Sequence, residues 1–145
     1  MTRLLLRVLA LAGLTLLLGG CASFDASVDS GRSLKDVQRF FVLSNLNDNR
    51  AIDHQIVAAL RARGLVAEAG PHTMMPDDVQ AVISYQDQWT WDFGDHLVYL
   101  QISVRDRQSA QNLASATFST RLPTRTPPEG IVDGLVAKLL AEERR

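Results

Sequence analysis

Residues 81–122 read AVISYQDQWTWDFGDHLVYLQISVRDRQSAQNLASATFSTRL and carry the clearest structural pattern of the chain. Apolar and polar residues alternate along three runs, which polar turns at 92–95 and 106–112 separate. A period of two places successive side chains on opposite faces of a β-strand. The stretch therefore predicts three strands joined by hairpins, which form an antiparallel meander.

One face of the first run is aromatic. Tyr85, Trp89, Trp91 and Phe93 share that face, and Asp87 interrupts it. These rings either pack in the core against a helix or line a groove for a partner protein, a glycan or a lipid. A carboxylate that is buried without a partner is costly, which argues against a purely core role. Tyr and Trp are also enriched at binding surfaces, because each combines a flat ring with a polar tip.

The end of this run favours exposure of at least one tryptophan. Trp91 is the better candidate because it lies beside the turn, and hairpin turns lie at the surface. Carboxylates on either side suit the polar rim of an interface. We therefore take as a possible binding surface Tyr85, Asp87, Trp89, Trp91 and Asp92.

The flanking segments complete the expected domain. The apolar run at 40–43 predicts a buried strand, and a helix is expected over 50–63, after a polar loop that can supply its N-cap. A short strand follows at 65–69. Downstream, Thr126-Pro127-Pro128-Glu129 fits a capping box with proline at the first helical position. The helix that it opens has an apolar stripe of Ile131, Val132, Leu135, Val136, Leu139 and Leu140.

These elements predict an α+β domain over residues 33–145. The expected order is β-α-β-β-β-α, in a two-layer sandwich whose sheet is mainly antiparallel and whose helices cover one face. The other face of the sheet is expected to stay partly polar, as antiparallel sheets allow.

The first twenty residues are typical of a secretory signal peptide. Arg3 and Arg7 supply its positive start, residues 8–18 are uncharged and rich in leucine, and Gly19 and Gly20 are small. The apolar run is too short for a transmembrane helix, which needs roughly 20 residues. We expect residues 1–20 to be removed.

Cys21 is the single cysteine of the chain, so it has no internal disulfide partner. Leu18-Gly19-Gly20-Cys21 resembles the lipobox of bacterial lipoproteins. That resemblance implies cleavage before Cys21, a thioether diacylglycerol on its sulfur and acylation of the new amino terminus. In that family the absence of Asp after the cysteine directs the protein to the outer membrane, and Ala22 stands there. The inner membrane is the alternative.

Residues 21–32 are mostly small and polar, and we interpret them as a tether between the lipid and the domain. An ordered first strand is the alternative, because Phe24, Ala26 and Val28 alternate with polar residues.

A second resemblance rests on the aromatic run. Its Tyr-x-Asp-x-Trp-x-Trp-Asp pattern, the hairpin and the capped last helix are similar to a family of small uncharacterised bacterial envelope lipoproteins. The residues that match the motif are Tyr85, Asp87, Trp89, Trp91 and Asp92. This resemblance implies an α+β domain that faces the periplasm, and it implies no activity.

The sequence contains no recognisable catalytic or metal-binding motif. His54, His72 and His96 show no metal-binding spacing, so we expect no metal and no cofactor. Serine nucleophiles have no G-x-S-x-G context. Carboxylates near the hairpin could in principle act in pairs, as in glycosidases, but nothing in the sequence sets their separation: Asp77, Asp78, Asp87, Asp92 and Asp95.

The expected function is therefore that of a lipid-anchored, non-enzymatic binding or assembly protein of the cell envelope. Its expected partners are the membrane, through the lipid, and an envelope protein. The net charge of −1 gives no basic field for nucleic acid. A hydrolase acting on cell-wall or lipid material is the alternative, and it would need a convergent set of polar groups. The sequence predicts no oligomeric state.

Overall fold

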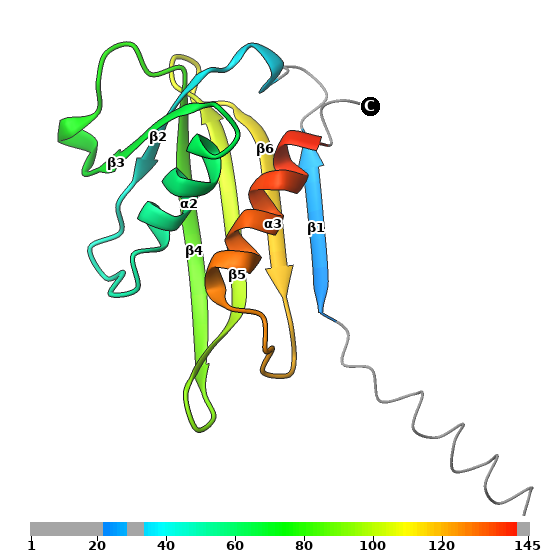
Figure 1. The fold of residues 1–145 in the computed structure, drawn as a ribbon. Helices are drawn as coiled ribbons and strands as arrows, with labels where there is room; N and C mark the ends of the chain where they lie inside the picture. The colour runs from blue at the N-terminus through cyan, green and yellow to red at the C-terminus, as the bar shows by residue number, and fades with distance from the viewer. Residues whose placement is uncertain (1–21, 29–33, 142–145) are drawn as a thin grey trace, which may run out of the picture.

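The computed structural model describes residues 22–28 and 34–141. They form one six-stranded sheet with the strand order β1-β6-β5-β4-β2-β3, and two α-helices pack on one of its faces (Figure 1). In chain order the elements are β1 (Ser23–Val28), the 3-10 turn η2 (Leu34–Asp36), β2 (Arg39–Leu43), α2 (Ile52–Arg61), β3 (Val66–Gly70), the 3-10 turn η3 (His72–Met74), β4 (Ala81–Trp91), β5 (Asp95–Asp106), β6 (Asn112–Ser119) and α3 (Pro128–Ala141).

The meander is present as predicted. Strands β4, β5 and β6 pair antiparallel in sequence order, with Tyr85 opposite Ile102 and Ile102 opposite Ala116. Together with the two helices on one face, this confirms an α+β fold with a mainly antiparallel sheet. The sheet is nevertheless mixed, because β2 pairs in parallel with both β3 and β4.

Strand β2 is parallel to its neighbours because α2 carries the chain back across the sheet between β2 and β3. A parallel pair requires such a crossover, and the strand inside it is covered on both faces. Accordingly Phe40, Phe41 and Val42 are all buried, although consecutive side chains point to opposite faces. Gly70 on β3 lies against the Phe41 ring, where a Cβ would stand 3.4 Å from its Cζ.

The segment before residue 33 differs from the expectation. The tether interpretation of residues 21–32 is wrong for Ser23–Val28, which form β1 and pair antiparallel with β6. The hydroxyls of Ser23 and Ser27 lie 2.9 Å from those of Ser119 and Ser115. The alternating pattern was thus a strand signal. Cys21 and residues 29–32 lie outside the described residues, as does the expected signal peptide.

The expected order β-α-β-β-β-α therefore contains two strands fewer than the structure. It omits β1, and it has three strands rather than four between the helices, although the run at 65–69 was itself expected to be a strand. That run forms β3, one residue later than expected. Within residues 22–28 and 34–141, no helix is long and apolar enough to cross a bilayer.

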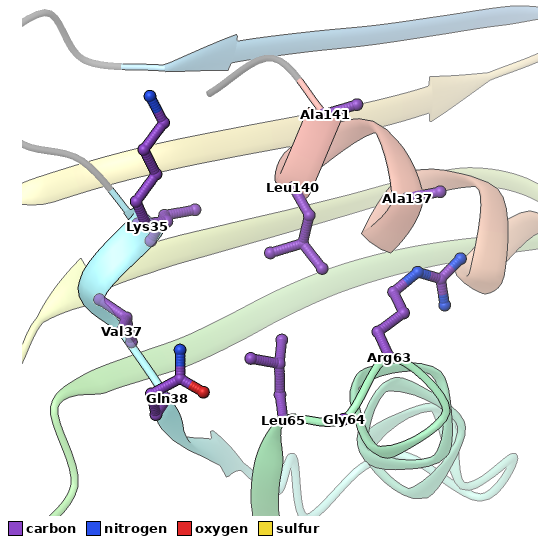
Figure 2. Close-up of a pocket in the computed structure, with 10 residues that line it drawn as sticks. Lys35, Val37, Gln38, Arg63, Gly64, Leu65, Ala137, Leu140 and Ala141 are labelled. Carbon is purple, nitrogen blue, oxygen red and sulfur yellow. The ribbon is translucent and has the colours of Figure 1, made fainter. Parts of the chain in front are cut away.

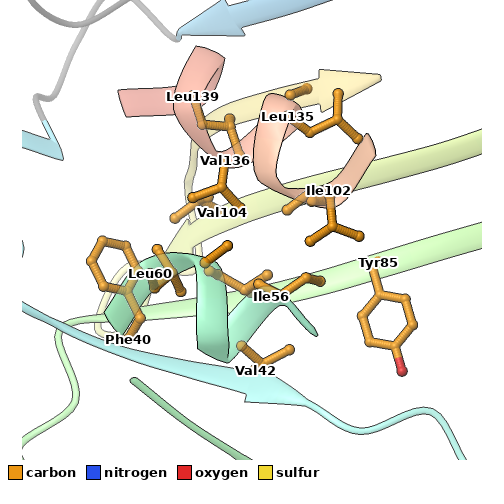
Figure 3. Close-up of a cluster of buried hydrophobic side chains, with 14 of the residues drawn as sticks. Phe40, Val42, Ile56, Leu60, Tyr85, Ile102, Val104, Leu135, Val136 and Leu139 are labelled. Carbon is orange, nitrogen blue, oxygen red and sulfur yellow. The ribbon is translucent and has the colours of Figure 1, made fainter. Parts of the chain in front are cut away.

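The core lies between the sheet and the helices (Figure 3). Ile56 of α2 and Leu135 of α3 are fully buried and meet strand residues such as Ile102. The apolar stripe expected on the last helix is confirmed for five of its six residues, while Leu140 at its end is partly buried. The five buried residues are Ile131, Val132, Leu135, Val136 and Leu139. Tyr85 lies at the end of this cluster, with its hydroxyl pointing away from it (Figure 3).

Candidate binding surface

The aromatic face of β4 divides into three environments. Tyr85 is 7% exposed, Trp89 is half-buried, and Trp91 is 73% exposed. Phe93 follows β4 in the turn and is 97% exposed. A β-bulge separates Tyr85 from the two tryptophans, because the pairing of β4 with β5 shifts between Gln88 and Trp89. Beyond the bulge the hairpin extends past the helices (Figure 1).

Tyr85 joins the sheet to the loop before α2. Its hydroxyl donates a 2.7 Å hydrogen bond to Oδ2 of Asp48 and accepts one from the backbone N–H of Asn45. Burial raises the pKa of Tyr85, and the hydrogen bond to Asp48 raises it further. The hydroxyl therefore remains a donor throughout the neutral range.

Asp48 serves as the cap of α2, although it lies three residues before Ala51, which occupies the N-cap position. Its two carboxylate oxygens accept 2.7 Å hydrogen bonds from the backbone N–H groups of Arg50 and Ile52. Burial raises the pKa of Asp48, but the hydrogen bonds from Tyr85 and from the backbone outweigh it and leave the pKa below the ordinary 3.8. The loop was expected to supply such a cap.

Trp89 is covered by a cation from that same loop. The guanidinium carbon of Arg50 lies 4.0 Å from the centroid of the Trp89 ring, and Arg50 Nη2 lies 2.7 Å from Oδ2 of Asp95. On its other side, Trp89 Nε1 donates a 2.5 Å hydrogen bond to Oδ2 of Asp87. Asp87 therefore has a hydrogen-bond partner within the aromatic face. The cost of burying an unpaired carboxylate no longer argues against burial of Asp87 and Trp89.

The tip of the hairpin carries an exposed pair of rings. The centroids of Trp91 and Phe93 lie 6.1 Å apart, with an angle of 35° between the ring planes. Phe93 adopts a φ of 50°, a left-handed conformation that aromatic residues rarely adopt. The turn is closed by a 2.9 Å hydrogen bond from the N–H of Asp92 to the carbonyl of Gly94.

The five residues expected to form a binding surface thus separate. Tyr85 belongs to the core, Asp87 and Trp89 bind one another, and Trp91 and Asp92 are exposed at the tip. The expectation that a tryptophan is exposed is confirmed for Trp91, and its contact with a partner stays a prediction. Asp48 and Arg50 were not expected to contribute, and no sequence signal linked Arg50 to Trp89.

Three of the five carboxylates considered for catalysis form ion pairs with three different arginines. Asp77 lies 3.2 Å from Arg107 and Asp78 lies 3.0 Å from Arg39, while Asp95 binds Arg50. In the part of the chain that the structure describes, no group of three or more His, Cys, Asp and Glu side chains is placed to hold a metal.

A shallow groove of about 510 Å³ lies at the other end of the sheet, between η2 and the last turns of α2 and α3 (Figure 2). Leu65 and Leu140 point toward one another across it. Arg63 borders the groove, but its guanidinium is held at 2.6 Å by Asp133, whose pKa this hydrogen bond lowers. The groove is lined by apolar residues such as Leu65 and Leu140 and also by the polar side chains of Lys35, Gln38 and Arg63.

No family model and no curated protein sequence matches the chain. Among solved structures, two PelC dodecamers from Paraburkholderia phytofirmans are similar to it. A variant in space group C2 has a TM-score of 0.59 at 18% identity, over 83% of this chain and 95% of that chain. The other, in space group P6, has a TM-score of 0.58 at 15% identity, over 83% and 96%.

A minor lipoprotein from Acinetobacter baumannii is also similar, at 14% identity over 74% of this chain and 90% of that chain. Its TM-score of 0.33 is too low to support an argument. At the identities of the PelC structures, the similarity shows a common fold.

Proposed function

We propose that this chain is a lipid-anchored lipoprotein of the bacterial envelope, held through Cys21 at the periplasmic face of the outer membrane. Its role is non-enzymatic binding or assembly. The observation that carries the proposal is the lipobox-like Leu18-Gly19-Gly20-Cys21, which ends two residues before the first residue of β1. A single cysteine at that position has a clear chemical use as the site of acylation. More than one acyl chain is required for stable anchoring.

The side-chain contacts support a non-enzymatic role over hydrolysis. Paired acids need a shared substrate site, with carboxylates about 5–10 Å apart across it. Here Asp77, Asp78 and Asp95 each bind a different arginine, and Asp87 accepts a hydrogen bond from Trp89. Such contacts are what structural carboxylates make.

We further propose that several copies of the chain assemble with one another, and the fold shared with PelC supports this proposal. PelC, whose solved structures are dodecamers, covers 83% of this chain. The sheet ends on both sides in an edge strand, β1 and β3, and edge strands offer unpaired backbone groups to a neighbour.

Lipid attachment is tested by replacing Cys21. In cells fed an alkyne fatty acid, the wild-type chain is expected to be labelled and to sediment with membranes, while Cys21→Ser is not labelled and sediments with membranes to a much smaller extent. Ser23→Ala, two residues away, is the matched control and is expected to behave as the wild type. Equal labelling of the wild type and Cys21→Ser would contradict the proposal.

The choice of membrane is tested by Ala22→Asp. Because Asp after the cysteine retains lipoproteins in the inner membrane, this variant is expected to move from the outer-membrane to the inner-membrane fraction of a density gradient. If the wild type and Ala22→Asp are both found in the inner-membrane fraction, the outer-membrane assignment is refuted.

A further inference from the structure

Four of the six large apolar side chains that are exposed among the described residues lie on the hairpin or on loops at one end of the sheet; the other two, Val66 and Met74, belong to β3 and η3. Trp91 and Phe93 occupy the tip of the β4–β5 hairpin, and Leu122 (58% exposed) lies in the loop between β6 and α3. Leu46 (97% exposed) lies in the loop after β2, which leaves the sheet at the same end because β2 runs parallel to β4. Apolar side chains that cluster at one exposed end indicate an interaction site.

The chain enters the sheet at this same end (Figure 1). The pairing places Ser23 opposite Ser119, Ser119 opposite Tyr99, and Tyr99 opposite Gln88, so these four residues lie at one level of the sheet. Beyond that level β4 continues for three more residues, to Trp91. At roughly 3.3 Å per residue, the hairpin projects about 10 Å past the start of β1.

This geometry sets how far the hairpin can be from the lipid. Cys21 precedes Ser23 by two residues, which span about 7 Å at most. Acyl chains on Cys21 must lie in the hydrocarbon layer, so the start of β1 is held close to the membrane surface. The hairpin projects about 10 Å beyond the start of β1. The link to Cys21 lets the start of β1 lie about 7 Å at most from Cys21, so the hairpin tip can still reach the membrane surface.

We propose that the hairpin tip is a second membrane contact, in which Trp91 and Phe93 insert into the interfacial layer of the same bilayer that holds Cys21. This inference rests on the proposed lipid anchoring. Tryptophan prefers the membrane interface, because its ring is apolar and its N–H remains hydrogen-bonded there. Asp92, between the two rings, keeps the insertion shallow, at the level of the headgroups.

The neighbouring loop fits the same role. Arg121 and Arg125 are exposed on either side of Leu122, and cations near the surface are attracted to anionic phospholipids. The left-handed conformation of Phe93 also supports a functional role for this residue. A glycine would adopt that conformation without strain, so the fold alone does not require an aromatic residue there. A strained, fully exposed aromatic residue contributes little to the fold, and strained backbone gathers at functional sites.

The test uses Cys21 as a chemical handle. The mature chain, from residue 21, is coupled through its one thiol to a maleimide lipid in vesicles of phosphatidylethanolamine and phosphatidylglycerol, with and without brominated acyl chains. Trp89→Phe leaves Trp91 as the single tryptophan, and Trp91→Phe leaves Trp89. Bromine is expected to quench Trp91 several-fold more strongly than Trp89, and Trp91 emission is expected to shift to the blue upon coupling.

Equal, weak quenching of the two tryptophans by brominated lipid would overturn the proposal and would leave the tip available to a protein partner. Circular dichroism melts of both single-tryptophan variants establish that the fold is kept. A second measurement uses the uncoupled Cys21→Ser chain, whose vesicle binding is expected to fall several-fold when Phe93→Asp is added. Because the lipid is attached chemically, the result is independent of whether cells acylate Cys21, so a failure of the proposed anchoring is recognised separately.

Discussion

The hydroxyl of Tyr85 donates a hydrogen bond of 2.7 Å to Oδ2 of Asp48, and this contact links the core of the sheet to the start of α2. The same carboxylate accepts the backbone N–H of Arg50, whose guanidinium lies over Trp89. A core tyrosine on β4 thus holds the loop that covers the next aromatic residue of the same strand. The base of the hairpin is held by these contacts, while its tip is exposed.

Tyr85→Phe is expected to lower the free energy of unfolding by about 1–2 kcal/mol, because Asp48 loses a buried hydrogen-bond donor. Tyr99→Phe is the matched control, since the Tyr99 hydroxyl makes a longer, 3.2 Å bond to Gln101. Urea denaturation followed by circular dichroism measures both. Equal losses in the two variants would show that the contact with Asp48 contributes nothing particular.

Stability is expected to depend on the ionisation of Asp48. Its pKa is lowered on folding, so the native state favours the charged carboxylate. The stabilisation is present above the ordinary pKa of 3.8 and is lost as the pH falls below that value through the lowered pKa. The difference in unfolding free energy between the wild type and Asp48→Asn should therefore shrink below about pH 3.8. A difference that stays constant into that acidic range would contradict the assignment.

Arg50→Ala is expected to expose Trp89. In the Trp91→Phe background, where Trp89 alone emits, acrylamide quenching should increase. The unfolding free energy should fall by about 0.5–2 kcal/mol, as a cation–π contact and an ion pair are lost. Arg121→Ala, on an exposed loop, is the control and should change neither quantity. Unchanged quenching in Arg50→Ala would show that Trp89 is covered by other groups.

Phe24→Ala tests whether β1 is part of the fold. The Phe24 ring lies 4.9 Å from that of Phe118 and packs against the core, so its removal should lower the unfolding free energy by about 2–4 kcal/mol. Asp25→Ala, on the opposite face of β1, should have little effect. If residues 23–28 were a tether, the two variants would melt alike.

The elements with a strong periodic pattern could be predicted from the sequence. The alternation along β4, β5 and β6 specifies strands that are half covered, and the stripe of α3 specifies a docked helix. The direction of β2 could not be predicted, because five residues with three consecutive buried side chains do not indicate how a strand pairs. β1 was missed because serine and aspartate on its open face make the segment resemble a linker, although Phe24, Ala26 and Val28 face the core.

The candidate surface was predictable only at its tip. Exposure of Trp91 follows from its place beside a turn, which is local information. The fates of Tyr85 and Trp89 depend on Asp48 and Arg50, which lie more than thirty residues earlier and reach β4 only because β2 is parallel to it. The bulge between Gln88 and Trp89 leaves Val98 of β5 without an opposite residue, so that Leu97 and Leu100 are both buried, and no glycine or proline marks it in the sequence.

The pairing of β1 with β6 joins the two most distant strands of the chain, since Ser23 and Ser119 are 96 positions apart. Because β1 is the first strand along the chain and β6 is the last, this pair closes over every other strand of the sheet. A large sequence separation slows the formation of such a pair more than it lowers the stability of the folded protein. Until β1 docks, β6 presents a bare edge to any other copy of the chain. The β1 of a neighbouring molecule could pair with the same edge, so we expect domain swapping through β1 when the chain misassembles.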